Sequence, residues 1–125
     1  MFNKNQRNGM ERKSINFIEP VFRSDDPVET LKAIKQLNLK QSKSQLRKFF
    51  DEVKKDLQEN EIKKHVVRLT LLIEYSKNRK VIDKEFYECM NKCLEYLMKN
   101  PTKQNYEKFY QFLEGIVAFH SKKEG

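Results

Sequence analysis

The sequence predicts an all-α fold, a compact single-domain bundle of about five helices. The chain has 125 residues, which is the size of one domain. It contains only three glycines and three prolines, and so few helix breakers favour long helices. Residues 1–19 lack an apolar stripe long enough to anchor a helix, so we expect a flexible N-terminal segment there. We expect residues 20–125 to form the bundle.

The first two helices are predicted from their start signals. The stretch Asp26–Glu29 offers an aspartate cap, a proline at the first helical position and an acidic residue at the third. A short helix follows, with an apolar face made by Leu31, Ile34 and Leu37. The second helical segment, Leu39–Asn60, has Ser42 and Gln45 at the spacing of a capping box. Its apolar stripe consists of Leu46, Phe49, Phe50, Val53 and Leu57.

A third helix is predicted from Glu61 onward, where a stripe of apolar residues begins. This stripe consists of Ile62, Val66, Leu69 and Ile73. Three further apolar residues, Val67, Leu71 and Leu72, broaden the apolar surface. We therefore expect this helix to be buried on more than one side and to lie centrally in the bundle.

The last two helices are separated by a proline. Asp83 can cap the first of them, and Asn100-Pro101 ends it because the residue before a proline avoids helical geometry. Thr102 then starts the last helix. Its expected core residues are Tyr106, Phe109, Tyr110, Leu113, Ile116 and Val117.

The residue types that carry catalysis or hold metals are scattered. His65 and His120 lie on different predicted helices without neighbouring ligands, so structural or surface roles are expected. Cys89 and Cys93 lie one helical turn apart, and we expect them to be buried or half-buried thiols. The glycines are isolated from each other, so no phosphate-binding loop is indicated. We expect no catalytic residues, no metal and no cofactor.

The apolar residues also exclude a membrane span. No apolar run approaches the roughly 18 residues that would cross a bilayer. The first residues contain no signal-peptide segment. We therefore expect a cytoplasmic protein that does not associate with membranes.

A basic surface is the main functional signal. Lys and Arg number 26 against 18 Asp and Glu, a net charge of +8 that attracts polyanions. The alternative is that the excess of basic residues only keeps the helical surface soluble. On the second helix, Arg47 and Lys54 share one flank of the apolar stripe. Lys48 falls beside Glu52 on a face that looks solvated.

The third helix has a basic flank of its own. Arg68, Tyr75 and Arg79 occur at i, i+7 and i+11, with Lys80 close by. Arginine pairs with phosphate and tyrosine can stack on a base, which suits single-stranded nucleic acid. The same residues could form a structural salt-bridge and cation–π cluster. No motif for reading base sequence is present, so backbone binding is favoured.

Three segments resemble a known family, the small subunit of type III-A CRISPR effector complexes. They are Ser44–Glu52 (SQLRKFFDE), Tyr75–Lys80 (YSKNRK) and Phe109–His120 (FYQFLEGIVAFH). The resemblance covers residues 39–120. The family usually has alanine where this chain has Gly115, and often tyrosine where it has Phe119. Glycine inside a helix costs about 1 kcal/mol relative to alanine, so a weak point or a close helix contact is expected at Gly115.

The resemblance implies a non-catalytic, all-helical subunit of an antiviral ribonucleoprotein. Its implied partners are guide RNA, single-stranded target RNA, the other subunits of the complex and copies of itself. Arg47 and Arg79 match the arginines of the family's motifs and are the leading RNA-binding candidates. From charge geometry we add Lys48, Lys54, Arg68 and Lys80.

Two other function classes stay open from the residues alone. A basic helical module could bind acidic proteins and never touch nucleic acid. A small helical nuclease would need carboxylates or histidines gathered in one pocket, and the spacing does not provide them.

Overall fold

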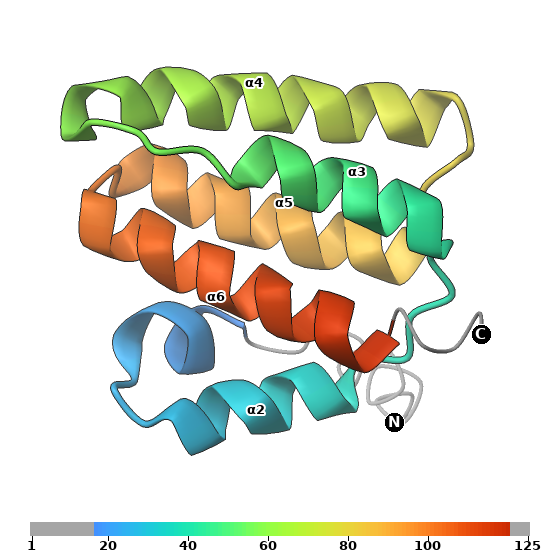
Figure 1. Cartoon of the computed structure of the whole chain (residues 1–125), viewed down its shortest axis with the longest axis horizontal. Coiled ribbons are helices and arrows are strands. Elements are labelled where there is room, and N and C mark those ends of the chain that lie inside the picture. The colour runs from blue at the N-terminus through green and yellow to red at the C-terminus, as the bar shows by residue number, and fades with distance from the viewer. Residues whose placement is uncertain (1–16, 121–125) are drawn as a thin grey trace, which may run out of the picture.

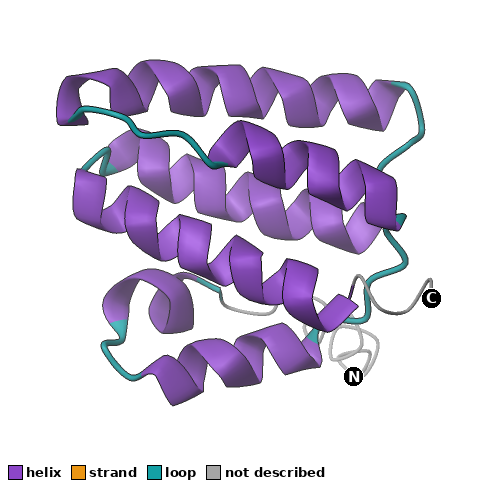
Figure 2. Cartoon of the chain, viewed as in Figure 1, coloured by secondary structure: helices purple, strands orange, loops and turns teal. Residues whose placement is uncertain are grey.

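A computed structural model describes residues 17–120, which form six helices and no strand (Figures 1 and 2). The predicted all-α fold is confirmed. A single-turn π-helix comes first, and five α-helices follow where about five helices were predicted. The elements are η1 (Glu19–Arg23), α2 (Pro27–Gln36), α3 (Lys43–Val53), α4 (Glu59–Asn78), α5 (Lys84–Lys99) and α6 (Lys103–His120). None of these helices is both long and apolar enough to cross a bilayer.

The C-terminal helix α6 is the centre of the fold. Helices α3 to α6 alternate in direction, and η1 and α2 cover the side of α6 that faces away from α4 (Figure 1). Each of the other described elements packs against α6. The side chains of α6 that are 0% exposed are Phe109, Phe112, Leu113 and Ile116.

The prediction that the helix after residue 61 would lie centrally is wrong. α4 packs mainly on α5 and lies along one edge of the molecule (Figure 1). Its expected stripe is buried, but Val67 and Leu71 are 43% and 64% exposed. The reason is that α6 occupies the centre, so α4 has only one layer of helices to pack against.

The predicted helix starts are confirmed by side-chain caps. The Asp26 carboxylate accepts a hydrogen bond from the Val28 N–H at 3.0 Å. Ser42 Oγ accepts from the Gln45 N–H at 3.2 Å, and the Asp83 carboxylate accepts from the Phe86 N–H. Each such cap stabilises its helix by about 1 kcal/mol. The predicted break at Asn100-Pro101 is also confirmed, because α5 ends at Lys99 and α6 begins at Lys103.

Helix α3 is shorter than the predicted segment 39–60, because it ends at Val53. Gln58 already caps α4, where the Glu61 side chain accepts a hydrogen bond from the Gln58 N–H at 2.7 Å. Leu57, which was expected on the second helix, lies in the connection and is partly buried.

Two side chains from other helices satisfy the carbonyls at the end of α3. Tyr106 Oη on α6 donates to the Val53 carbonyl at 2.6 Å. His65 Nε2 on α4 lies 2.8 Å from the Glu52 carbonyl, which confirms a structural role for this histidine. Burial raises the pKa of Tyr106 well above its usual value, so its hydroxyl stays protonated and able to donate.

The two cysteines are core residues, as expected. Cys89 and Cys93 are 1% and 0% exposed and unbridged. Burial, reinforced by the adjacent Cys93, raises the pKa of the Cys89 thiol well above its usual value. A buried, protonated thiol is neither a nucleophile nor a metal ligand.

The close helix contact expected at Gly115 is confirmed. A Cβ atom at this position would lie well inside van der Waals distance of Ile34 Cδ1 on α2. Because α2 is one of the elements that cover α6, the missing side chain lets the two helices approach.

The predicted flexible segment, 1–19, is only partly within the described chain. Residues 1–16 lie outside the described residues. Phe17 is 4% exposed, and its ring centroid lies 5.9 Å from that of Phe112. Glu19 already belongs to η1.

We predict that Gly115→Ala destabilises the protein, and that Ile34→Val relieves the effect. Ile34→Val alone should cost about 0.5–1.5 kcal/mol, but it removes the Cδ1 atom that meets the new methyl group. In the Ile34→Val background, Gly115→Ala should be neutral or stabilising by up to about 1 kcal/mol, because alanine favours helix. Urea unfolding of the four proteins in the double-mutant cycle measures this coupling.

Ile73→Val is the matched control for that cycle. Ile73 is buried on α4 and is not among the atoms near the Gly115 position. It should leave the cost of Gly115→Ala unchanged. If Gly115→Ala had the same effect on stability in the Ile34→Val and Ile73→Val backgrounds, the proposed contact with Ile34 would be contradicted.

We predict that Tyr106→Phe lowers the free energy of unfolding by about 0.5–1.5 kcal/mol, because the Val53 carbonyl loses one of its two donors and keeps only the Lys55 N–H. Tyr110→Phe is the control on the same helix. The Tyr110 ring stacks on Phe50, and its hydroxyl forms no hydrogen bond with the described residues. Equal losses for the two variants would show that the Tyr106 hydrogen bond adds nothing specific.

Candidate functional site

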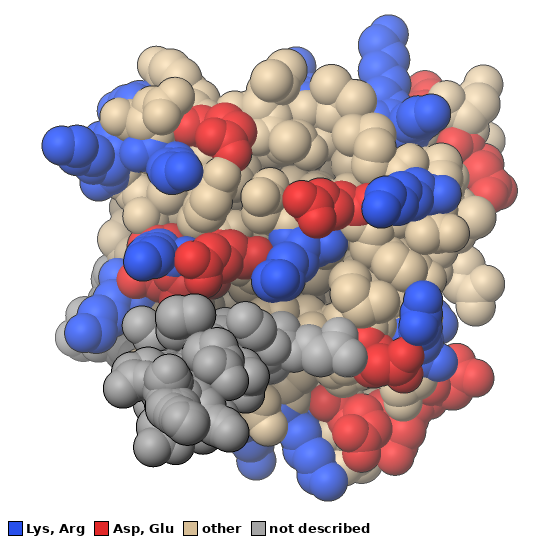
Figure 3. All heavy atoms as spheres, turned by 180° about the vertical axis from the view of Figure 1, so that it is seen from behind, with Lys and Arg blue, Asp and Glu red and all other residues tan. Residues whose placement is uncertain are grey.

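Basic and acidic side chains are interleaved on the rear face of the molecule. Figure 3 shows this face, opposite to the view of Figure 1, with Lys and Arg alternating with Asp and Glu across its middle. Such a balanced surface has little net attraction for a polyanion. Two of the candidate cations, Lys48 and Arg79, instead line a groove between α3 and α4.

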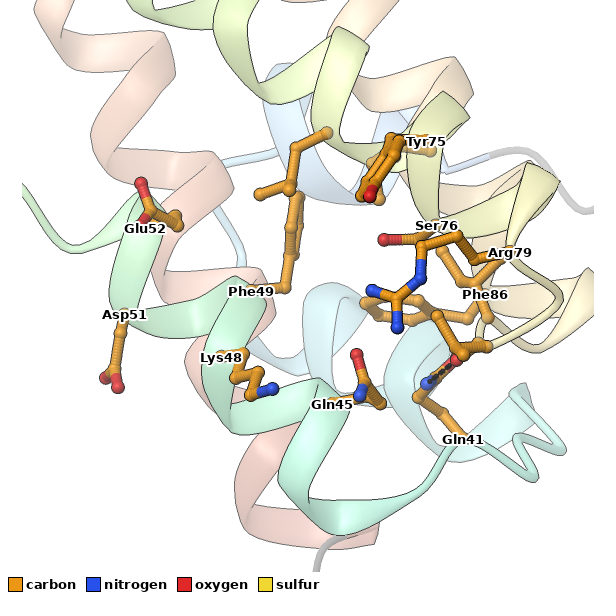
Figure 4. A pocket seen from close by; sticks show the side chains of 14 residues that line it. Gln41, Gln45, Lys48, Phe49, Asp51, Glu52, Tyr75, Ser76, Arg79 and Phe86 are labelled. Carbon is orange, nitrogen blue, oxygen red and sulfur yellow. Dashed lines mark hydrogen bonds between the residues drawn. The ribbon is translucent and has the colours of Figure 1, made fainter.

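A groove of about 360 Å³ lies between α3 and α4 (Figure 4). Its apolar lining comes from α3, α4, α5 and the α4–α5 connection, and consists of Phe49, Leu72, Ile73, Val81, Ile82 and Phe86. The Phe49 and Phe86 rings meet edge to face with centroids 5.9 Å apart, and both side chains are buried. The floor of the groove is thus part of the core and is held in a fixed shape.

One end of the groove is closed by the residues around Gln41. Its Nε2 donates to the Val81 carbonyl at 3.0 Å, and its Oε1 accepts from the Asp83 N–H at 2.5 Å. These two bonds tie the α4–α5 connection to the segment that precedes α3. They also hold in place the turn that carries Arg79.

A left-handed residue ends α4 beside the groove. Lys80 has a φ of 61°, and the Val81 N–H bonds back to the Ser76 carbonyl at 3.1 Å. This arrangement is a common way to end a helix, although glycine usually takes the left-handed position. It places Arg79 at the rim of the groove and leaves Lys80 exposed next to it.

Basic groups converge at one end of the groove. In Figure 4 the side chains of Arg79, Lys48 and Gln45 point toward one another across the opening. The Arg79 guanidinium also lies 5.5 Å from the centre of the Tyr75 ring, a cation–π distance. Tyr75 is 60% exposed, so this aromatic surface is available to a ligand.

The carboxylates occupy the other end. Asp51 and Glu52 point away from the cluster around Arg79 (Figure 4). Glu52 Oε1 lies 3.8 Å from Arg68 Nε, an ion pair whose side chains are 36% and 71% exposed. A pair this exposed contributes about 1 kcal/mol or less, so it holds Arg68 only weakly.

The structure divides the six predicted site residues. It brings Lys48 and Arg79 together across the groove, and it places Arg68 beside Glu52 at the opposite, acidic end. Arg47 on α3 and Lys54, the residue directly after α3, are exposed but do not line the groove. Lys80 is exposed in the turn after α4. Lys48 is exposed beside Glu52, as expected, but it also lies opposite Arg79, which was not expected.

Sequence reasoning missed several residues of the groove. Gln45 was noted only for its place in a capping box, and Phe86 was not among the candidate site residues. Leu72 was expected to be buried by a second layer of helices, but it lines the groove. Periodicity shows which residues share one face of a helix. It does not show which face of another helix packs opposite that face.

The described residues contain no group of three or more His, Cys, Asp or Glu side chains that could hold a metal ion. The end of the groove around Arg79 offers cations, amides and an exposed aromatic ring. These groups can bind a phosphate or stack on a flat ring.

Comparison with known proteins gives a family match. A family model described as Csm2 Type III-A matches residues 24–125, which is well over half of the chain. The match confirms the resemblance found in residues 39–120 and extends it toward the N-terminus. No curated protein and no solved structure gives a significant match.

Proposed function

This chain belongs to the Csm2 type III-A family, and we propose that it is a non-catalytic small subunit that binds RNA in a type III-A CRISPR complex. It contacts the backbone of guide RNA and single-stranded target RNA without reading their sequence. It works in the cytoplasm with the other subunits and with copies of itself, and helps to assemble the effector filament in antiviral defence.

The observation that carries this proposal is the basic end of the groove. Arg79 and Lys48 reach it from two helices, and Tyr75 lies exposed beside them. A guanidinium pairs with phosphate through two parallel hydrogen bonds, and an exposed tyrosine ring accepts any base by stacking. Arg47, Lys54, Arg68 and Lys80 would extend this surface along α3 and α4.

Binding without sequence specificity follows from the kind of groups involved. Phosphate contacts position a protein on nucleic acid and carry no base identity. The candidate cations are long, exposed side chains, and most of them have no fixed partner among the described residues. Such a surface follows a backbone and tolerates any base.

We predict that Arg47→Ala/Arg79→Ala weakens binding of a labelled single-stranded RNA roughly tenfold, or by about 1.4 kcal/mol, because two phosphate contacts are lost. Fluorescence anisotropy over a range of salt concentrations measures both affinity and the number of contacts. The slope of log K against log salt should fall by about 0.7 for each contact removed.

The matched control is Lys92→Ala/Lys99→Ala on α5, which also removes two exposed positive charges. It should change affinity much less, and circular dichroism should show both proteins fully helical. Equal losses in the two variants would mean that net charge alone drives binding. No binding by the wild-type protein at low salt would favour the protein-interaction module.

We predict that Glu52→Gln strengthens RNA binding about two- to threefold, because it frees Arg68 and removes a negative charge beside the groove. Glu88→Gln on α5 makes the same charge change at an exposed position away from the groove. The two anisotropy titrations are compared at the same salt concentration. An identical gain in both would exclude Arg68 from the binding surface.

A further inference from the structure

The groove between α3 and α4 has an apolar floor that backbone binding does not use. Arg79 and Lys48 can pair with phosphate, but a phosphate offers nothing to the apolar side chains between them. Part of this floor is still open to water, because Leu72 and Ile82 are only partly buried. A ligand with an apolar face would gain free energy by covering it.

The size of the groove favours one flat ring system over a segment of another protein. Its volume is about 360 Å³, near the lower end of the range for sites that hold a small organic molecule, about 300–1,000 Å³. An α-helix about 10 Å across occupies about 420 Å³ in each turn of 5.4 Å, so not even one turn would fit inside. A single nucleobase is compact enough to enter.

Two polar side chains of the groove, those of Gln45 and Ser76, make no hydrogen bond with another described residue. The Gln45 amide is half-buried and points toward the opening in Figure 4. An amide carries both donors and an acceptor, and a hydroxyl can act as either, so the two side chains can pair with the polar edge of any base. Gln41, by contrast, uses both ends of its amide within the protein.

The charges at the two ends of the groove determine how a nucleotide would lie in it. Arg79 and Lys48 lie at one end, and Asp51 and Glu52 lie at the other (Figure 4). A phosphate is attracted to the first end and repelled from the second. A base joined to a phosphate at Arg79 would lie over the floor, beside the exposed ring of Tyr75.

We propose that the groove binds one unstacked nucleobase over its apolar floor, with the phosphate of the same nucleotide between Arg79 and Lys48. This inference rests on the proposed function, and it names the part of the RNA that the groove holds. The ligand is a nucleobase joined to a phosphate, which either a strand of RNA or a free nucleotide can supply. Because Gln45 and Ser76 can pair with any base, capture of a base keeps binding independent of sequence.

The test compares labelled RNA strands that differ only in their bases, with the full wild-type chain. One strand is a hexanucleotide of uridine, the second is the same ribose-phosphate chain without bases, and the third is the baseless chain with a single inner adenine. Fluorescence anisotropy should show that the baseless strand binds about tenfold more weakly than the uridine strand, because a base contact is lost. The single adenine should restore most of the affinity, because the groove holds one base.

Ser76→Phe blocks the groove without changing its charge. This variant should bind all three strands as weakly as the wild type binds the baseless strand, because Arg79 and Lys48 remain while the added ring fills the space for the base. Asn60→Phe is the control, since it adds the same ring at an exposed position about 24 Å away along α4. It should keep the wild-type pattern, and circular dichroism checks that both variants fold. If Ser76→Phe still preferred strands with bases, the base would lie on Tyr75 outside the groove, contrary to the proposal.

Isothermal titration calorimetry with free ligands distinguishes the two sources of the base. Adenosine monophosphate should bind more tightly than ribose 5-phosphate if a free nucleotide enters the groove. If the single adenine strengthens binding of the strand while the two free ligands bind equally, the base comes from RNA.

The same measurements separate base capture from the proposed RNA contact. Equal affinity for strands with and without bases, together with equal binding of the two free ligands, would overturn base capture and leave the backbone contact intact. Tighter binding of adenosine monophosphate than of ribose 5-phosphate, with no binding of any strand, would contradict the RNA contact and leave base capture intact.

Discussion

The burial of α6 on two opposite sides is the constraint that organises this fold. Its aromatic and aliphatic residues face in more than one direction, so a single layer of helices cannot cover them. Helices α3, α4 and α5 cover one side, and η1 and α2 cover the other (Figure 1). Because α6 takes the centre, α4 is left at the edge. The groove between α3 and α4, and the exposed apolar row on α4, both follow from this arrangement.

Local signals made the helix starts predictable, and distant partners made one helix end unpredictable. Asp26, Ser42 and Asp83 cap helices through atoms two or three residues away, so the sequence pattern contains the whole interaction. The end of α3 depends on Tyr106, which is 53 residues from Val53 in the chain. The predicted position of α4 was wrong for a similar reason, since periodicity identifies the apolar residues of a helix but not the helices that cover them.

The same limit applies to the candidate site. The period of a helix puts Arg68, Tyr75 and Arg79 on one flank of α4, and this much was predictable. That Lys48 lies across from Arg79 depends on how α3 packs against α6. The family motifs pointed to Arg47 and Arg79 equally, but only Arg79 lines the groove. The roles of all six cations in RNA binding stay predictions.

The placement of α4 and α2 at opposite edges bears on how each edge can vary in sequence. Both helices pack on α6, which lies between them. Substitutions that are far apart and share no partner have additive effects on stability. The exposed face of α4 and that of α2 can therefore change independently of each other without disturbing the packing on α6.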